Sequence, residues 1–288
     1  MRRAIVTRVA AKETILRLPL TFIALVALAM PALAEPQSVR FPGEGVTLSA
    51  IYYRPSGPGP FPAVVALHGC GGLNNSDGSL NARHRDWGER LSAQGFAVLL
   101  PDSFASRGLG SQCSVVKREV RPSRERVADA RAALAWLQGL PEIKPEAVNL
   151  LGWSNGGSTV LYGVRPAAAP AAGPDFAKAV AFYPGCRVPL QGGAWRTRMP
   201  LLMLVGEADD WTGVEPCRDL AKAAQARGEK VELVTYPGAY HDFDHPSAKL
   251  RLRTGLGFTV NDTGEAHTGT DPAARADALT RVPVYLAR

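Results

Sequence analysis

Several patterns that mark specialised protein classes are missing from this 288-residue sequence. It has no internal repeat, no low-complexity tract and no fibrous or collagen-like composition. Lysine and arginine form no block interleaved with aromatic residues, so the sequence gives little support for nucleic-acid binding. None of the four cysteines stands in a CxxC spacing, which argues against a metal or redox centre. With 46% hydrophobic residues the chain can bury one large core, and we expect a single domain over residues 35–288.

The N-terminal segment has the composition of a secretory signal peptide. Five basic residues precede an apolar run over residues 18–29, and Ala32-Leu33-Ala34 then offers an A-x-A cleavage site. The run of about a dozen residues is too short to cross roughly 30 Å of hydrocarbon as a helix. We therefore expect residues 1–34 to be cleaved and the protein to be exported, periplasmic or extracellular, without stable membrane insertion. A buried N-terminal helix or a retained anchor is the alternative.

Removing this leader also changes the charge of the chain. The leader holds five of the 33 basic residues and one of the 26 acidic residues, so the formal net charge falls from +7 to +3. The basicity of the full sequence is thus largely a property of the targeting segment.

The four cysteines all follow the predicted cleavage site. They are Cys70, Cys113, Cys186 and Cys217. An exported protein meets an oxidising compartment in which disulfides persist, so we expect two bridges. Sequence alone allows three pairings, and the order of the predicted strands favours Cys70–Cys113 and Cys186–Cys217. Four free buried thiols are the alternative.

Short apolar runs alternate with segments of helical periodicity along the rest of the chain. The runs cover residues 63–67, 97–100, 148–151, 179–182 and 201–205, with further strands expected at 46–53 and 231–235. The helical segments cover residues 83–94, 122–137, 156–164, 214–227 and 272–286. This alternation predicts the α/β class, with a mostly parallel central sheet and helices on both faces. Two stretches, 103–114 and 250–269, read as long loops, each either a lid or a surface excursion.

The strongest local signal is Gly152-Trp153-Ser154-Asn155-Gly156-Gly157, a G-x-S-x-G motif between a predicted strand and a predicted helix. A nucleophile elbow needs this context, because the chain must turn sharply and side chains at the flanking glycines would clash. The helix that follows directs its N-terminal N–H groups at the site and favours negative charge there. We predict that Ser154 is a nucleophile; a structural Gly-rich turn is the alternative.

A serine nucleophile needs a base that is itself oriented by an acid, and in this arrangement the chain order is serine, acid, histidine. His241 follows the last predicted strand and is the preferred base, ahead of His245 and His267. Asp209 lies at the carboxyl end of the 201–205 strand in a Gly-x-x-Asp turn and is the preferred acid. Asp210 and Glu207 are the nearest competitors. Their non-catalytic interpretation is that they are solvated loop acids or cap the helix that follows.

The developing oxyanion requires two backbone donors. One expected donor is the N–H of Asn155, the residue after the nucleophile. The other is the N–H of Cys70, because His68-Gly69-Cys70-Gly71-Gly72 resembles the His-Gly-x-Gly oxyanion loop of esterases. In this loop we interpret His68 as structural.

A metal site must be weighed at residues 241–245, where His-Asp-Phe-Asp-His packs four ligand-type side chains into five positions. A helical zinc motif needs both histidines on one helical face, and the prolines on either side of this segment disfavour a helix. We predict no metal and no organic cofactor.

Four motifs in register resemble the dienelactone hydrolase family of α/β hydrolases. They are LHGCGGLN, GWSNGG, GEADDWT and YPGAYHDFD, spread over residues 61–286. The resemblance implies an α/β-hydrolase fold without a large cap domain, and a catalytic triad of Ser154, Asp209 and His241. The enzymes that give the family its name use a cysteine nucleophile and are typically cytoplasmic, so the resemblance carries over a reaction class and not dienelactone as substrate.

The sequence therefore predicts a secreted serine hydrolase that cleaves a carboxylic ester-type bond in a small-molecule substrate through an acyl-enzyme. A peptidase or thioesterase with the same three residues is the alternative within this class. A non-catalytic ligand-binding scaffold is the alternative from another class, although a pure binder has no need for the complete nucleophile, base and acid set.

Overall fold

The computed structural model describes residues 36–170, 172–187, 189 and 195–288, together with residues 4, 5, 7, 8 and 10. The apolar run and cleavage site of the predicted signal peptide lie outside these residues. Within them, no helix combines the length and the hydrophobicity needed to cross a membrane.

The described fold is built on a sheet with the strand order β1-β2-β4-β3-β5-β6-β7-β8. The strands are β1 (Gln37–Gly43), β2 (Val46–Tyr53), β3 (Phe61–Leu67), β4 (Ala97–Asp102), β5 (Ile143–Trp153), β6 (Ala179–Phe182), β7 (Leu201–Gly206) and β8 (Val231–Tyr236). The pairs from β4 through β8 are parallel, while β1 and β2 run antiparallel to their neighbours. The mostly parallel sheet predicted from the apolar runs is confirmed.

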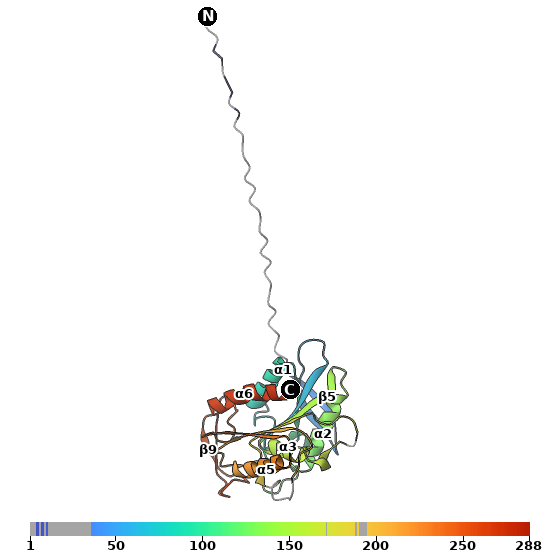
Figure 1. The fold of residues 1–288 in the computed structure, drawn as a ribbon, viewed down its shortest axis with the longest axis vertical. Coiled ribbons are helices and arrows are strands. Elements are labelled where there is room, and N and C mark those ends of the chain that lie inside the picture. Colours follow the sequence, from blue (N-terminus) through green and yellow to red (C-terminus); the bar gives the residue numbers. More distant parts are fainter. Residues whose placement is uncertain are drawn as a thin grey trace. The chain divides into compact units, whose positions relative to one another are not determined.

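Within the described residues, five helices cover the two faces of this sheet (Figure 1). They are α1 (Ala82–Ala93), α2 (Glu125–Gln138), α3 (Asn155–Gly163), α5 (Glu215–Ala226) and α6 (Pro272–Ala287). Alternate residues of β3 show why its sequence is apolar throughout. Val65 and Leu67 belong to the core beneath α2, α3 and α5, whereas Val64 and Ala66 belong to the core beneath α1 and α6. Because successive side chains point to opposite faces, a strand that is covered on both faces needs an unbroken apolar run.

Two parts of the chain differ from the sequence-based expectation. Strand β1 was not predicted, because it is an edge strand whose residues are mostly exposed and include Pro42. The stretch 250–269 was expected to be a loop throughout, but it contains β9 (Arg251–Arg253) and β10 (Ala266–Thr268), a short antiparallel pair. Strands of three residues give too short an alternation to stand out in a sequence. Stretch 103–114 contains only the 3-10 turn η1 (Ala105–Arg107).

Two disulfides join segments that are distant in the sequence. Cys70 bonds to Cys113 and Cys186 bonds to Cys217, which is the pairing favoured by the order of the strands. The first bridge ties the loop after β3 to the 103–114 stretch, and the second ties the segment after β6 to helix α5.

Removing the second bridge should weaken the fold without changing the residues around Ser154. We expect the double variant Cys186→Ala with Cys217→Ala to lose about 3 kcal/mol of unfolding free energy, because the unfolded chain regains the entropy of an open loop of 31 residues. Urea denaturation of both proteins under non-reducing conditions measures this difference. An unchanged unfolding midpoint would show that the bridge does not stabilise the protein.

Candidate active site

Ser154 lies at the sharp turn between β5 and α3. Its backbone has a φ of 53°, a left-handed conformation that is costly for a residue with a side chain. The neighbouring chain is packed so closely that a Cβ atom at Gly156 would lie 2.1 Å from the carbonyl oxygen of Leu67. A Cβ atom at Gly152 would lie 2.3 Å from the carbonyl oxygen of Gly156. The two glycines therefore permit the turn that presents Ser154 at the end of the strand.

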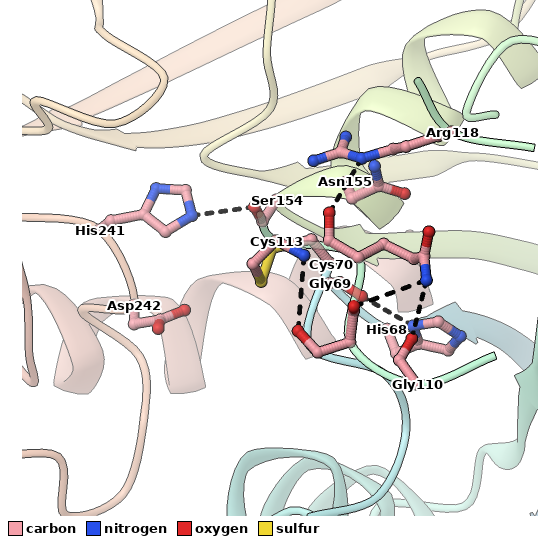
Figure 2. Close-up of a disulfide and its surroundings, with 12 residues drawn as sticks. His68, Gly69, Cys70, Gly110, Cys113, Arg118, Ser154, Asn155, His241 and Asp242 are labelled. Carbon is pink, nitrogen blue, oxygen red and sulfur yellow. Dashed lines mark hydrogen bonds between the residues drawn. A yellow bond between two sulfur atoms is a disulfide. The ribbon is translucent and has the colours of Figure 1, made fainter. Parts of the chain in front are cut away.

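Three residues predicted from separate motifs come together here. The Nε2 atom of His241 lies 2.9 Å from Ser154 Oγ, and its Nδ1 atom lies 2.8 Å from Asp209 Oδ2 (Figure 2 shows the first of these contacts). His241 is 1% exposed and Asp209 is 5% exposed, so water does not compete strongly for these bonds. The result is a continuous hydrogen-bonded chain from a carboxylate through an imidazole to a hydroxyl.

Asp209 is held by donors from its own turn. Its Oδ1 atom accepts the backbone N–H groups of Trp211 and Thr212 at 2.9 and 3.0 Å, and its Oδ2 atom accepts the Thr212 hydroxyl at 2.8 Å. Burial by itself would raise the pKa of Asp209, but the attraction of His241 and these hydrogen bonds outweigh it and lower the pKa overall. The carboxylate therefore stays ionised and fixed in direction.

The competing acids and histidines have other partners. Asp210 accepts the backbone N–H of His267 at 2.8 Å and contacts its Nδ1 atom at 2.7 Å. Glu207 pairs with Arg218 at 2.8 Å. The ring of His245 accepts the backbone N–H of Ser247 at 3.1 Å. The structure therefore brings Asp209 and His241, and not these competitors, into the hydrogen-bonded chain with Ser154.

The loop that carries Cys70 lies directly against the serine. A Cβ atom at Gly69 would lie 3.5 Å from the Cβ atom of Ser154. Cys70 is fixed twice, by its disulfide to Cys113 and by its carbonyl oxygen, which accepts the Gln112 N–H at 2.7 Å. Figure 2 shows Cys70, Ser154 and Asn155 around one point. The two residues predicted to supply oxyanion donors thus come from the loop after β3 and from the first turn of α3, which meet at the serine.

Arg126 links these two segments, and it was not predicted from the sequence as a site residue. This fully buried side chain donates to the Asn155 side-chain oxygen at 2.6 Å and to the His68 carbonyl oxygen at 2.8 Å. It comes from α2, on the same helical face as the buried residues Ala130 and Ala133. Arg126 and Asp129 are two charged residues among the apolar ones on the buried face of α2, and this pattern is the sequence signal that could have revealed Arg126.

Two aromatic rings hold His241 and were also missed. The centroid of the Tyr183 ring lies 4.4 Å from that of the imidazole, and the centroid of the Trp211 ring lies 4.7 Å from it. Tyr183 is in turn fixed by its hydroxyl, which donates to Asp244 at 2.6 Å. The imidazole is therefore confined on the sides that do not bind Ser154 and Asp209.

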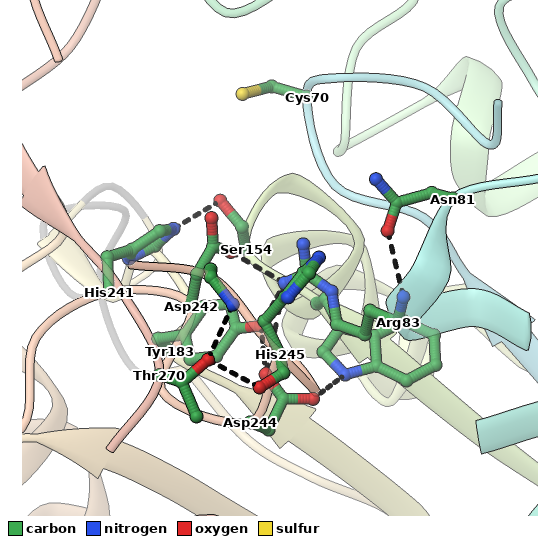
Figure 3. Close-up of polar contacts among 12 residues, drawn as sticks. Cys70, Asn81, Arg83, Ser154, Tyr183, His241, Asp242, Asp244, His245 and Thr270 are labelled. Atoms are coloured by element: carbon green, nitrogen blue, oxygen red, sulfur yellow. Dashed lines mark hydrogen bonds and ion pairs between the residues drawn. The ribbon is translucent and has the colours of Figure 1, made fainter. Parts of the chain in front are cut away.

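The carboxylates of the His-Asp-Phe-Asp-His segment are occupied by other donors (Figure 3). Asp244 accepts the indole N–H groups of Trp87 and Trp153, each at 2.8 Å, and Asp242 accepts from Arg83 at 2.6 Å. In the part of the chain that the structure describes, no three histidine, cysteine or acidic side chains are grouped as a metal site would require.

Two histidines near the site are buried in the neutral form. The Nε2 atom of His68 accepts the backbone N–H of Ser103, so a proton at this nitrogen would oppose an existing donor. Burial and then the charge of Arg126 hold the pKa of His68 well below its ordinary value. Burial, followed by the charge of Arg83, lowers the pKa of His84 to about 3.

These histidines make the stability of the fold depend on pH. Below about pH 6.5 the unfolded chain binds a proton at each, while the folded protein keeps them neutral. The free energy of unfolding should therefore fall by roughly 1 kcal/mol per pH unit for each histidine as the pH drops below this value. Urea denaturation between pH 7 and pH 4.5 measures the slope, and His84→Gln should make it shallower by one histidine. A stability that is flat over this range would refute the assignment.

With the geometry established, the chain can be compared with known proteins. The model of the dienelactone hydrolase family matches residues 48–288. The chain belongs to the dienelactone hydrolase family. The match contains Ser154, Asp209 and His241, so the hydrogen-bonded chain lies entirely within the family region.

Solved structures similar to this family member share its fold. A dienelactone hydrolase-like promiscuous phosphotriesterase from metagenomic libraries is 20% identical, with a TM-score of 0.67 over 88% of this chain and 98% of the other. Esterase 2 of Thermogutta terrifontis, solved after phosphorylation by paraoxon, is 21% identical, with a TM-score of 0.61 over 90% of this chain and 95% of the other. Among curated proteins, the quorum-quenching protein AidA of Acinetobacter baumannii is 32% identical over 126 residues, which cover 44% of this chain and 38% of AidA.

Proposed function

We propose that this member of the dienelactone hydrolase family is an exported serine hydrolase that cleaves carboxylic esters. The observation that carries the proposal is the hydrogen-bonded chain from Asp209 through His241 to Ser154, with distances of 2.8 and 2.9 Å. A serine hydroxyl is a weak nucleophile until a base removes its proton, and this chain supplies both the base and the acid that orients it.

In the first half of the proposed reaction, Ser154 Oγ forms a bond to the ester carbonyl carbon while its proton passes to His241 Nε2. Asp209 stabilises the imidazolium that results. The tetrahedral oxyanion then collapses, the bond to the alcohol oxygen breaks, and His241 returns the proton to that oxygen. The alcohol leaves and the acyl group stays on Ser154.

In the second half, water replaces the alcohol. His241 removes a proton from the water as it attacks the acyl carbon, and the bond to Ser154 Oγ breaks. The proton returns to Oγ, and the carboxylic acid leaves. Water is the only co-reactant that these steps consume, so the proposed mechanism uses no metal or organic cofactor.

The backbone N–H groups of Cys70 and Asn155 are the proposed oxyanion donors. Preorganised donors of this kind accelerate acyl transfer because they need no rearrangement when the charge develops. Arg126 supports the arrangement, since it binds both the Asn155 side chain and the loop that leads to Cys70. The disulfide from Cys70 to Cys113 holds the same loop from the other side.

We further propose that residues 1–34 are removed during export and that residues 35–288 form the mature enzyme. The two disulfides support an oxidising destination, because such bonds persist outside the cytoplasm. The intact mass of the protein recovered from an exporting host tests the cleavage, with Glu35 as the expected first residue.

The test of the proposed activity uses the full chain expressed with export and then purified. We expect turnover of p-nitrophenyl acetate and butyrate, with a burst of p-nitrophenol equal to the enzyme concentration if deacylation is the slower step. A matched thioester and a peptide p-nitroanilide distinguish the related alternatives, and we expect both to be slower than the ester. A protein that hydrolyses none of the three would contradict the proposal.

A further inference from the structure

Two cavities meet at Ser154. The first, which we call the apolar cavity, measures about 460 Å³, and its walls include Val116, Tyr162 and Phe258. The second, which we call the polar cavity, measures about 400 Å³, and its walls include Arg83 and Asp242. Both volumes lie within the usual range of small-molecule sites, roughly 300 to 1,000 Å³.

The residues that line the two cavities show how each cavity is placed relative to Ser154, His241 and Asn155. Ser154, Cys70 and Trp211 line both, so the serine stands where the cavities join. His241 lines only the polar cavity, whereas Asn155 lines only the apolar one. The polar cavity is thus the one beside His241, and the apolar cavity is the one beside Asn155.

Three of the four basic residues around the apolar cavity, Arg118, Arg121 and Arg187, have partners of their own, and the fourth, Lys117, is exposed. Arg118 lies over the ring of Phe258 and donates to the Gln112 carbonyl oxygen. Arg121 pairs with Glu125 at 2.7 Å. The surfaces left to a ligand are therefore mainly aromatic and aliphatic, which suits an apolar group.

The polar cavity offers both hydrogen-bond donors and acceptors. Its wall includes Asn74, Asn81, Asp242 and Thr268, together with the three arginines Arg83, Arg251 and Arg253. An amide or hydroxyl can donate and accept, arginine only donates, and an ionised aspartate only accepts. A ligand with hydroxyl groups matches such a mixed set, since each hydroxyl also donates and accepts.

The proton transfer decides which half of the ester enters which cavity. His241 Nε2 must deliver its proton to the alcohol oxygen, so the alcohol leaves on the side of His241. We propose, on the basis of the proposed esterase activity, that the substrate is an ester of an apolar acid with a polyhydroxylated alcohol. The acyl group occupies the apolar cavity and the alcohol occupies the polar cavity.

A pair of isomeric esters tests this orientation directly. One is 2,3-dihydroxypropyl 3-phenylpropanoate, which has an apolar acyl group and a dihydroxy alcohol. The other is 3-phenylpropyl 2,3-dihydroxypropanoate, in which the two halves are exchanged. We expect kcat/KM for the first to exceed that for the second by at least about 100-fold, after each is divided by its rate of alkaline hydrolysis. Equal values, or a preference for the second ester, would overturn the proposal.

Variants of the polar cavity test whether this cavity causes the preference for the first ester over the second. Arg253→Met should reduce the ratio of the two kcat/KM values at least about 10-fold, because it removes a donor from the polar cavity. Arg40→Met is the matched control, since Arg40 is exposed on β1 and lines neither cavity, and its ratio should stay unchanged. An unchanged ratio in Arg253→Met would overturn the assignment of the polar cavity to the alcohol.

A third substrate separates hydroxyl recognition from charge recognition. The carboxymethyl ester of 3-phenylpropanoic acid places an anion in the polar cavity, whose wall holds Asp242 together with Arg83, Arg251 and Arg253. If the cavity recognises hydroxyl groups and not charge, this ester is the poorer substrate. Faster cleavage of this ester than of the dihydroxypropyl ester would overturn the hydroxyl assignment. Failure of the underlying esterase proposal has a different signature, because p-nitrophenyl acetate would then also remain intact.

Discussion

Replacing Ser154 with alanine is expected to lower kcat for ester hydrolysis by about 10⁶-fold. The substitution removes the atom that we propose attacks the carbonyl, together with the hydroxyl that contacts His241. Catalysis that remains comes from substrate binding and the oxyanion donors. Steady-state turnover of p-nitrophenyl butyrate measures the loss, with enough enzyme to detect the residual rate.

The control for this variant is a second buried serine. Ser92 lies in α1, lines neither cavity and is 3% exposed, so Ser92→Ala should keep its activity. Ser154→Ala should also unfold at a urea concentration close to that of the wild type, because a single oxygen atom is removed at the end of a strand. A Ser154→Ala protein that is folded and retains even one hundredth of the activity would mean that another group is the nucleophile.

Asp209→Asn is expected to lower kcat by about 10⁴-fold while leaving the fold intact. The carboxylate accepts the Nδ1 hydrogen of His241, whereas an amide can present its NH₂ group to that nitrogen and favour the wrong tautomer. The hydrogen bonds from Trp211 and Thr212 hold the carboxylate oxygens in place, so the role belongs to this position and not to any nearby acid.

Asp210→Asn is the matched control for this second prediction. Asp210 is adjacent in sequence, but its partner is His267 and not His241. We expect its kcat to remain within a few-fold of the wild-type value. If Asp210→Asn were the more damaging of the two substitutions, the acid would have been assigned to the wrong residue.

The fold could be predicted where a local pattern reflects the final packing. Strands covered on both faces leave unbroken apolar runs, and a strand-to-helix turn around a nucleophile leaves glycines such as Gly152 and Gly156. Strand β1 could not be found in this way. It is a strand because it pairs with β2 at the edge of the sheet, and its mostly exposed residues form no apolar run. The pair β9 and β10 is likewise defined by its pairing and not by its composition.

In the site, too, residues marked by a local motif could be predicted, and residues whose role depends on contacts between distant segments could not. Ser154 is marked by its own motif, but the choice of His241 over His245 depends on which loop residue reaches the serine. Asp244 illustrates what sequence cannot supply, since its three donors come from three separate parts of the chain. Such a network has no spacing that a sequence pattern could capture.

The role of Ser154 is tested most directly by mass spectrometry of the protein after reaction with paraoxon, the reagent that phosphorylates esterase 2 of Thermogutta terrifontis. We predict one diethylphosphoryl group per chain, on the peptide that contains Ser154, with esterase activity lost in proportion to the modification. The Ser154→Ala variant should take up none. An unmodified protein, or a phosphoryl group on another residue such as Ser158, would contradict the proposal that Ser154 is an activated nucleophile.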